Sequence, residues 1–310
     1  MKNLVTGGCG FIGSNLIDRL IKNGEFVVCL DDLTSGRSEN IKKFLNNNKF
    51  RFIQHDVINP LKLNIRIEKI WHLACPASPI HYQIDPIRTS KINFQGTLNI
   101  LEFAKENNSK LLLASSSEVY GNPKIHPQNE EYLGSVNPIG IRSCYDEGKR
   151  IAESLCFDFS RMYDLEIKVA RIFNTYGPNM SLNDGRVISN FISQGLQKKP
   201  LTIFGKGDQS RSFCFIEDLI EGLIKFMNSS YKGPINLGNP EEITIKNLAY
   251  LISGKVGNEF LYKEMSLPID DPQKRRPSIE KAIKFIDWEP NYSLSKGLDL
   301  TIDYFKKVLN

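Results

Sequence analysis

A tyrosine and a lysine lie four positions apart in the Tyr-x-x-x-Lys run formed by Tyr145 and Lys149. Positions i and i+4 of a helix share one face, so the lysine ammonium can lower the pKa of the phenol and also hold a nucleotide ribose. The lowering matters because an unperturbed phenol, with a pKa of about 10, stays protonated at neutral pH and is a poor base. Taken alone, the pair also fits a core tyrosine beside an exposed lysine.

Three consecutive serines stand upstream of this pair. Ser115, Ser116 and Ser117 follow a short apolar run at residues 111–114 that has the composition of a buried strand. Ligands of open α/β sheets bind beyond the carboxyl ends of the strands. We therefore expect a serine hydroxyl to lie beside Tyr145 and to assist it in proton transfer.

A third constellation lies near the N-terminus, where Gly7, Gly10 and Gly13 form a GxxGxxG pattern between a strand-like run and a helical pattern. Glycines at such a turn let a pyrophosphate approach the backbone at a helix N-terminus, where free N–H groups favour anions. Asp31 follows Gly13 by 18 residues, where its carboxylate can accept from the ribose hydroxyls of adenosine. That carboxylate would repel a 2′-phosphate, which favours NAD over NADP. Arg37 keeps NADP as an alternative, and the glycines by themselves also fit a simple tight turn.

These groups need a scaffold, and the first half of the chain shows an alternating pattern of strands and helices. Buried strands are predicted at residues 3–6, 26–30, 50–54, 70–74, 111–114 and 167–173, and helices at 11–22, at 87–106 and from about Tyr145 onward. Repeated strand–helix–strand units imply parallel strands with right-handed crossovers. The predicted fold class is therefore α/β, a Rossmann-type doubly wound parallel sheet with a smaller C-terminal substrate-binding domain.

The pattern changes in the second half of the chain. It predicts a loop at 176–184, a helix at 186–197, a short strand and a turn within 200–209, a helix at 215–228, a strand at 234–237 that returns to the first sheet, and a loop at 268–277 followed by two helices. We expect residues 1–175, with about 210–238 returning, to form the dinucleotide-binding domain. Residues 176–209 and 239–310 would form the substrate domain.

The bulk composition argues against several classes of protein. The 310 residues, 41% hydrophobic and 24% charged, suffice for two packed domains. The sequence has no apolar run long enough for a transmembrane helix, and its net charge of +5 without a basic helix argues against a nucleic-acid partner. Six scattered cysteines and four histidines without ligand spacing predict no metal site and fit a reducing cytoplasm.

Serine, tyrosine and lysine in this order, behind a glycine-rich loop, resemble the catalytic set of the short-chain dehydrogenases. Longer runs are similar to one family of the extended branch, the UDP-glucuronate decarboxylases (UDP-xylose synthases), over nearly the whole chain. These runs are HLACPASP from His72, NPIGIRSCYDEGKR from Asn137, ARIFNTYGP from Ala170, DGRV from Asp184, NLGNPEE from Asn236, DDPQKRRP from Asp270 and WEP from Trp288.

The resemblance implies NAD-dependent decarboxylation of UDP-glucuronate to UDP-xylose. Tyr145, assisted by Ser116 and Lys149, would remove the proton of the sugar C4 hydroxyl while NAD⁺ takes the C4 hydride. The resulting 4-keto acid carries its carboxylate β to the carbonyl and loses CO₂ readily, because the electrons flow into an enolate that Tyr145 and Ser116 can stabilise. Protonation at C5 and return of the hydride would complete the cycle, with Glu118 and Arg275 acting around C5.

The resemblance also assigns residues to the two ligands. Cofactor contacts are implied for Gly7, Gly10, Phe11, Ile12, Gly13, Asp31, Asp32, Ser35, Gly36, Asp56, Val57, Leu73, Cys75, Tyr145, Lys149 and Thr175. Substrate contacts are implied for Ser78, Tyr82, Glu118, Tyr145, Asn174, Arg186, Thr202, Phe204, Arg211 and Arg275. The arginines suit bidentate phosphate contacts. Thr202 and Phe204 would border the uracil, and Ser78 and Tyr82 would receive the sugar carboxylate.

Neighbouring chemistries stay open as alternatives. Sugar 4,6-dehydratases carry an Asp-Glu pair after the active-site Ser or Thr, and Ser117 stands at that Asp position, so elimination lacks its acid. In 4-epimerases the Glu118 position is typically not acidic, which argues against that reaction here. A UDP-sugar 4-epimerase stays the second candidate. A third is an oxidative decarboxylase that releases the 4-keto pentose. A silent NAD(H) sensor would lack Tyr145, Lys149 or Glu118, and all three are present.

Two residues depart from the family pattern: Ser278 stands where many relatives carry Asp, and Lys62 stands where an aromatic residue is common. Family members pair as homodimers through helices that correspond to residues 87–106 and 145–162, so a homodimer is expected. Golgi relatives carry an N-terminal membrane anchor that this sequence does not show, so a soluble cytoplasmic enzyme is expected.

Overall fold

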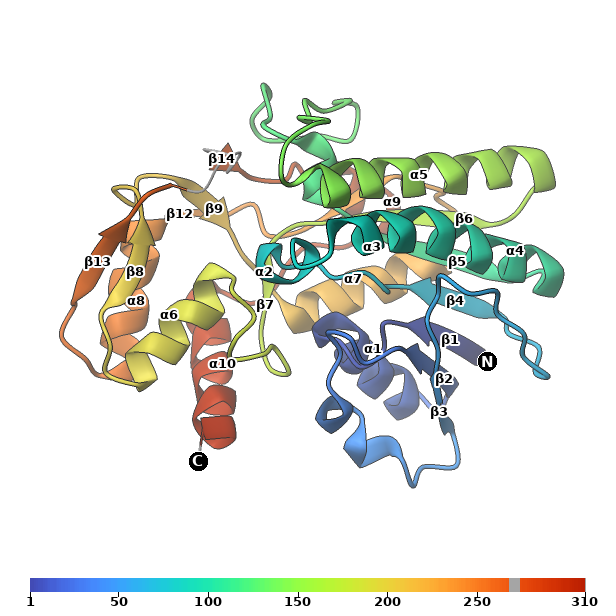
Figure 1. The fold of residues 1–310 in the computed structure, drawn as a ribbon, viewed down its shortest axis with the longest axis horizontal. Helices are drawn as coiled ribbons and strands as arrows, with labels where there is room; N and C mark the ends of the chain where they lie inside the picture. The colour runs from blue at the N-terminus through green and yellow to red at the C-terminus, as the bar shows by residue number, and fades with distance from the viewer. Residues whose placement is uncertain (268–273, 310) are drawn as a thin grey trace.

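The computed structural model describes residues 1–267 and 274–309. Within this part of the chain, seven parallel strands form one sheet in the order β11-β6-β5-β4-β1-β2-β3 (Figure 1). Their bounds are β1 Lys2–Thr6, β2 Phe26–Asp31, β3 Phe50–Gln54, β4 Lys69–His72, β5 Lys110–Ser116, β6 Ile167–Ile172 and β11 Ile235–Leu237. The chain winds outward from β1 to one edge and from β4 to the other, which is the doubly wound arrangement. The predicted fold class is confirmed.

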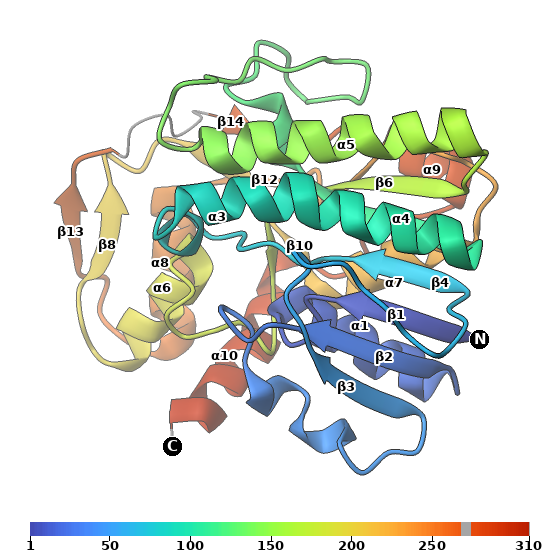
Figure 2. The same ribbon diagram turned by 45° about the vertical axis from the view of Figure 1, so that its right-hand side comes forward.

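Apolar side chains of each strand alternate between two cores, one on each face of the sheet. Val5 and Leu112 belong to one core, and their neighbours Leu4 and Leu113 belong to the other. Strands buried on both faces in this way read as continuous apolar runs in the sequence. The helices that cover the faces are α1 Phe11–Lys22 and α7 Ile216–Asn228 on one side, and α4 Thr97–Asn107 and α5 Ser143–Tyr163 on the other (Figure 2).

The helix expected over residues 87–106 is interrupted. It consists of α3 (Pro86–Lys91), one π-helical turn (Ile92–Gly96) and then α4. Gly96 is the last residue of that turn, and a Cβ at this position would stand 2.8 Å from the Val57 side chain. The absence of a side chain therefore lets the helical segment pack closely against the loop after β3.

The second half of the chain builds smaller sheets beside the large one (Figure 1). Strand β8 pairs with β13, β9 lies between β12 and β14, and β7 pairs with β10. The bounds are β7 Thr175–Tyr176, α6 Val187–Leu196, β8 Leu201–Phe204, β9 Ser210–Ser212, β10 Cys214–Phe215, β12 Glu242–Thr244, α8 Ile245–Val256, β13 Tyr262–Met265, β14 Lys274–Arg275, α9 Glu280–Ile286 and α10 Leu294–Leu309. Short helical turns are α2 Pro79–Tyr82, η1 Ser38–Asn40, η2 Lys42–Phe44 and η4 Ser117–Tyr120.

Helix α8 was not predicted from the sequence. Thr244 caps it by accepting from the Asn247 N–H at 3.2 Å, and Leu248 and Ile252 are buried. Gly257 ends it with φ +79°, a conformation that favours glycine. The loop expected at 268–277 falls partly outside the described residues, and its described end contributes β14. In the described part of the chain, no helix has the length and apolar character needed to span a bilayer.

Candidate active site

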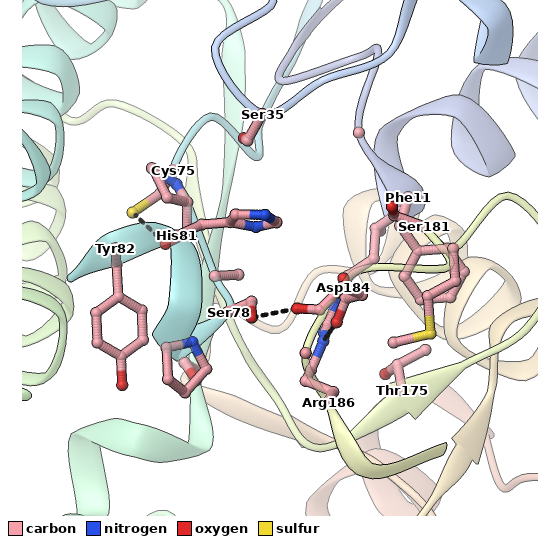
Figure 3. Close-up of a pocket in the computed structure, with 18 of the residues that line it drawn as sticks. Phe11, Ser35, Cys75, Ser78, His81, Tyr82, Thr175, Ser181, Asp184 and Arg186 are labelled. Carbon is pink, nitrogen blue, oxygen red and sulfur yellow. Dashed lines mark hydrogen bonds and ion pairs between the residues drawn. The ribbon is translucent and has the colours of Figure 1, made fainter. Parts of the chain in front are cut away.

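A cleft of about 600 Å³ opens beyond the carboxyl ends of β1, β2 and β5, and residues of β8, β9 and β14 line it as well. Every residue that the sequence assigned to cofactor, substrate or catalysis lines this one cleft. Figure 3 shows Cys75 and Tyr82 on one side of the pocket and Phe11, Thr175 and Arg186 on the other. The fold therefore brings the predicted site residues together, although they come from segments spread over most of the chain.

The glycine loop forms the turn from β1 into α1. Gly7 has φ +67°, and a Cβ there would lie 2.9 Å from the Ala74 backbone. A Cβ on Gly13 would lie 2.2 Å from the Gly7 carbonyl oxygen. The loop thus has room for no side chain at either position, and it leaves the N-terminus of α1 facing the cleft, as a pyrophosphate requires. This geometry fits NAD.

Asp31, at the end of β2, shapes the same loop. Its carboxylate accepts from the Cys9 N–H at 2.9 Å and from the Leu33 N–H at 2.8 Å. Burial raises the pKa of Asp31, while these two backbone bonds oppose the rise. Each carboxylate oxygen has a second lone-pair site, so Asp31 can still accept from ribose hydroxyls while it holds the turn in place.

Arg88 is a residue of this region that the sequence reasoning missed. Its Nη2 atom lies 2.7 Å from Asp32 Oδ2 and 2.7 Å from Asp56 Oδ2. Asp32 follows β2 and Asp56 follows β3, so one guanidinium on α3 ties the two loops together. In the sequence, Arg88 is only a cation near the start of a predicted helix, and such a residue is usually a solvated surface charge.

Tyr145 and Lys149 share one face of α5, as their spacing predicted, but the ammonium does not act as expected. Lys149 Nζ donates to the Ala114 carbonyl oxygen at 3.0 Å and lies 5.7 Å from the centre of the Tyr145 ring. Burial raises the pKa of the Tyr145 phenol above its ordinary value, and a hydrogen bond with Ser116 opposes that rise. The expected net lowering of the phenol pKa is therefore wrong, because burial raises it.

A second aromatic ring lies against Tyr145. Tyr82 stacks on it with a distance of 4.9 Å between ring centres and an angle of 9° between planes. The Tyr82 hydroxyl is buried and has no hydrogen-bond partner among the described residues. A buried hydroxyl without a partner is costly, so a ligand oxygen is expected to satisfy it.

Glu118 lies between two guanidinium groups. Arg275 Nη1 is 2.8 Å from its Oε1 atom, and Arg142 Nη2 is 2.8 Å from its Oε2 atom. Burial alone would raise the pKa of Glu118, but Arg275 and Arg142 lower it below its ordinary value. Glu118 is therefore ionised at neutral pH, and its negative charge balances cations that would otherwise repel each other.

Two further residues belong to this charged cluster, Arg142 immediately before α5 and Asp146 within it, and the sequence reasoning gave neither a role. Arg142 lines the cleft and was visible only as part of a family motif. Asp146 is buried, and its pKa is raised to about 7, first by burial and then by the negative charge of Glu118. No spacing rule indicates such a shift, because it depends on which charges the fold brings together.

The substrate end of the cleft has its own contacts. The Ser78 hydroxyl donates to the Asp184 carbonyl oxygen, and the Asp184 carboxylate pairs with Arg186 (Figure 3). The Thr202 hydroxyl accepts from Gln194 at 2.9 Å. The Ser78 hydrogen is already committed, so Ser78 can accept from a ligand but cannot donate to its carboxylate without breaking the Asp184 contact.

The remaining substrate candidates also line the cleft. Arg211 is buried and donates to the Ser210 carbonyl oxygen at 2.8 Å, and Phe204 keeps 38% of its surface exposed. Asn174 accepts from the Cys214 N–H at 2.8 Å through its backbone oxygen, which leaves its side chain for the cleft.

Comparisons with known proteins show the family to which the chain belongs. A model of the NAD dependent epimerase/dehydratase family matches residues 3–238, and the chain belongs to that family. It is 50% identical to UDP-glucuronic acid decarboxylase 1 of Xenopus tropicalis over 306 residues, which are 99% of this chain and 72% of that protein. It is 49% identical to UDP-glucuronic acid decarboxylase 3 of Arabidopsis thaliana over 311 residues, with 100% and 90% covered. Within the family, the chain is thus a member of the UDP-glucuronic acid decarboxylase group.

Solved structures share the whole fold at lower identity. The UDP-glucose 4-epimerase of Thermotoga maritima, in complex with UDP-glucose, superposes with a TM-score of 0.91 at 29% identity, and the match covers 100% of both chains. The UDP-glucuronic acid 4-epimerase of Bacillus cereus, in complex with UDP-glucuronic acid and NAD, gives a TM-score of 0.89 at 29% identity, with 99% of this chain and 100% of that chain covered.

Proposed function

We propose that this protein converts UDP-glucuronate to UDP-xylose and CO₂ with a bound NAD. The observation that carries the proposal is the ionised Glu118 between Arg275 and Arg142, beside Ser116 and Tyr145. A 4-epimerase needs a hydroxyl base and a cofactor, and it has no use for a buried carboxylate held by two guanidinium groups. The decarboxylase relatives favour the same reaction.

Proton transfer at C4 falls to Tyr145. Bound NAD would accept a hydride from the sugar C4 and return it after CO₂ has left, which side chains cannot do. Tyr145 takes the proton of the C4 hydroxyl, and Ser116 hydrogen-bonds the same oxygen. The carboxylate then lies β to a ketone, and loss of CO₂ leaves an enolate whose oxygen Tyr145 and Ser116 stabilise. Burial raises the pKa of the Tyr145 phenol, and the positive charge of the NAD⁺ nicotinamide ring would oppose that rise when the cofactor is bound.

Charge control around C5 falls to Glu118 and the two arginines. The pairing keeps Glu118 ionised, so it must take up a proton before it can donate one to C5. Arg275 and Arg142 favour an anionic sugar in the cleft. At the nucleotide end, Arg186 and Arg211 would bind the UDP phosphates, while Thr202 and Phe204 would border the uracil.

The test is a single-turnover labelling experiment. Purified protein with NAD⁺ and UDP-glucuronate should release CO₂ and form UDP-xylose. Substrate deuterated at C4 should give product that keeps the deuterium at C4, and incubation in D₂O should place deuterium at C5. Free NADH with a 4-keto pentose would indicate an oxidative decarboxylase, and UDP-galacturonate without CO₂ would indicate a 4-epimerase.

We also propose a homodimer that pairs through α3, α4 and α5. Ile87 on α3 and Met162 on α5 are each 71% exposed, and Phe94 in the π-helical turn between α3 and α4 and Ile151 on α5 are exposed as well. Large apolar side chains left exposed on adjacent helices favour a partner of the same kind. Light scattering at micromolar concentration should give twice the monomer mass, and a monomer alone would contradict the proposal.

The division of the chain and its location remain predictions. The dinucleotide-binding domain would be 1–175 with about 210–238, and the UDP-sugar domain 176–209 with 239–310. A cytoplasmic location is supported by the six cysteines, all of which are free thiols.

A further inference from the structure

Arg275 is supplied by a very short strand. Its backbone pairs with Arg211 through the two-residue strand β14, beside β9 (Figure 1). Its side chain crosses to the catalytic half of the molecule, where it donates to Ser117 Oγ at 3.2 Å and to the Gly121 carbonyl oxygen at 2.8 Å besides its pair with Glu118. Two residues of strand are a weak anchor for a side chain that must be placed to within a fraction of an ångström.

A second anchor follows directly after Arg275. The backbone of Gln128 donates to the Arg276 carbonyl oxygen at 2.8 Å and accepts from the Ser278 N–H at 2.7 Å. The side chain of Gln128 accepts from the Arg276 N–H at 2.9 Å through Oε1 and donates to the Ile125 carbonyl oxygen at 2.7 Å through Nε2. Gln128 is 1% exposed, so these bonds form away from competing water.

Gln128 is itself fixed to the large sheet. Asn236, on β11, donates to the carbonyl oxygens of Gln128 at 3.1 Å and of Ser278 at 3.0 Å. The Asn236 side-chain oxygen accepts from the Tyr120 hydroxyl at 2.8 Å. Ser278 takes part only through backbone atoms in these bonds, so the family departure at this position leaves them intact.

We propose that the side chain of Gln128 is a positioning residue for Arg275: it fixes the backbone of Arg276 to the sheet and so sets where the Arg275 guanidinium meets Glu118. The inference rests on the proposed function of Arg275 and Glu118. Gln128 does not line the cleft, so it touches neither ligand and acts only through the segment that carries Arg275.

The test uses an isosteric variant and a matched control. Gln128→Met keeps the volume and the backbone bonds but loses the bonds at Oε1 and Nε2. Gln128→Glu keeps an acceptor for the Arg276 N–H and should recover part of the loss. Tyr132→Phe removes a hydrogen bond in the same loop, from the Lys124 N–H to the tyrosine hydroxyl, without contact to Arg276, and should behave as wild type.

The expected result is a fall in kcat of about tenfold or more for Gln128→Met, with NAD affinity unchanged. A second readout is the acid limb of the pH–rate profile, which should move to higher pH because Arg275 is a main cause of the low pKa of Glu118. The groups that face Glu118 are Arg142 just before α5, Asp146 and Tyr145 on α5, Arg275 on β14, Arg211 on β9 and Tyr82 on α2. Only the position of Arg275 should differ among them in the variant.

Three outcomes would overturn the proposal: wild-type kcat in Gln128→Met, an equal loss in Tyr132→Phe, or a loss of kcat with an unshifted acid limb. If Gln128→Met does not fold, Gln128→Asn decides, because its shorter side chain withdraws the acceptor from the Arg276 N–H, and wild-type kcat with an unshifted limb in that variant would equally contradict the proposal. Failure of the proposed function is recognised separately, since wild-type protein would then release no CO₂.

Discussion

Arg275 Nη1 lies 2.8 Å from Glu118 Oε1, in a contact that joins the last part of the chain to the helical turn η4, which follows strand β5. Both side chains are largely buried, with 2% and 18% of their side-chain surface exposed. Removal of one partner would leave the other charged and poorly solvated, which costs more than the pair itself contributes. The contact therefore makes the catalytic half of the site depend on the strand that carries Arg275.

Glu118→Gln should reduce the rate of CO₂ release by about 10² to 10⁴-fold, because the C5 region loses the carboxylate that Arg142 and Arg275 share. NAD affinity should stay at the wild-type value, since Glu118 is not part of the glycine loop. Steady-state CO₂ release and a calorimetric titration with NAD⁺ check both parts. A variant with wild-type turnover would remove Glu118 from the mechanism.

Tyr145→Phe should retain NAD and UDP binding and lose about 10²-fold or more in turnover, the usual range for a positioned acid–base group. The stack with Tyr82 needs only the ring, so packing should persist. Tyr163→Phe, at the exposed end of the same helix, is the control and should turn over normally. Near-normal activity in Tyr145→Phe would rule out this tyrosine as the base.

Asp31→Ala should weaken NAD⁺ binding about tenfold or more and relax discrimination against NADP⁺, because a charge-assisted bond to the ribose is lost. The same change also removes the acceptor for the Cys9 and Leu33 N–H groups. Asp31→Asn keeps an acceptor but not the charge, so it should relax discrimination with less damage to the turn. Titration of both variants with NAD⁺ and NADP⁺ measures this, and unchanged NAD⁺ affinity in both would contradict the assignment.

Arg88→Gln should weaken NAD⁺ binding several-fold, because Asp32 and Asp56 lose their shared counter-ion and the two loops lose their tie. Lys91→Gln, an exposed cation on the same helix, removes the same charge without that tie and is the matched control. Equal NAD⁺ affinity in Arg88→Gln and Lys91→Gln would show that the tie has no influence on the cofactor.

Asp146→Asn should change how stability depends on pH. The folded state raises the pKa of Asp146 to about 7, so between about pH 4 and pH 7 the folded protein keeps a proton that the unfolded chain releases. Across that window the wild type therefore loses stability as pH rises, while Asn carries no such penalty. Relative to wild type, the free energy of unfolding of the variant should rise by on the order of 1–3 kcal/mol from pH 4 to pH 7 and should not rise further above pH 7. Urea unfolding at pH 5 and pH 8 measures the difference, and a constant offset would contradict the shift.

The sequence by itself determined the elements whose patterns are local. Gly7, Gly10 and Gly13 predicted the phosphate-binding turn because their spacing, a preceding strand and a following helix are all read within a few residues. The apolar runs predicted the parallel strands because strands covered on both faces have few polar positions. Tyr145 and Lys149 lie on one helical face because the helix repeat places i and i+4 together.

Only the tertiary structure decided what these side chains meet. Several contacts join segments that are distant in the chain. Glu118 pairs with Arg275 and Arg142, Arg88 pairs with Asp32 and Asp56, and the Gln128 side chain accepts from the Arg276 N–H. The direction of Lys149 toward Ala114 and the raised pKa of the phenol beside it are also tertiary effects. The physical reason is that a pKa or a charge balance depends on burial and on every neighbouring charge in space, and spacing along the chain carries no record of either.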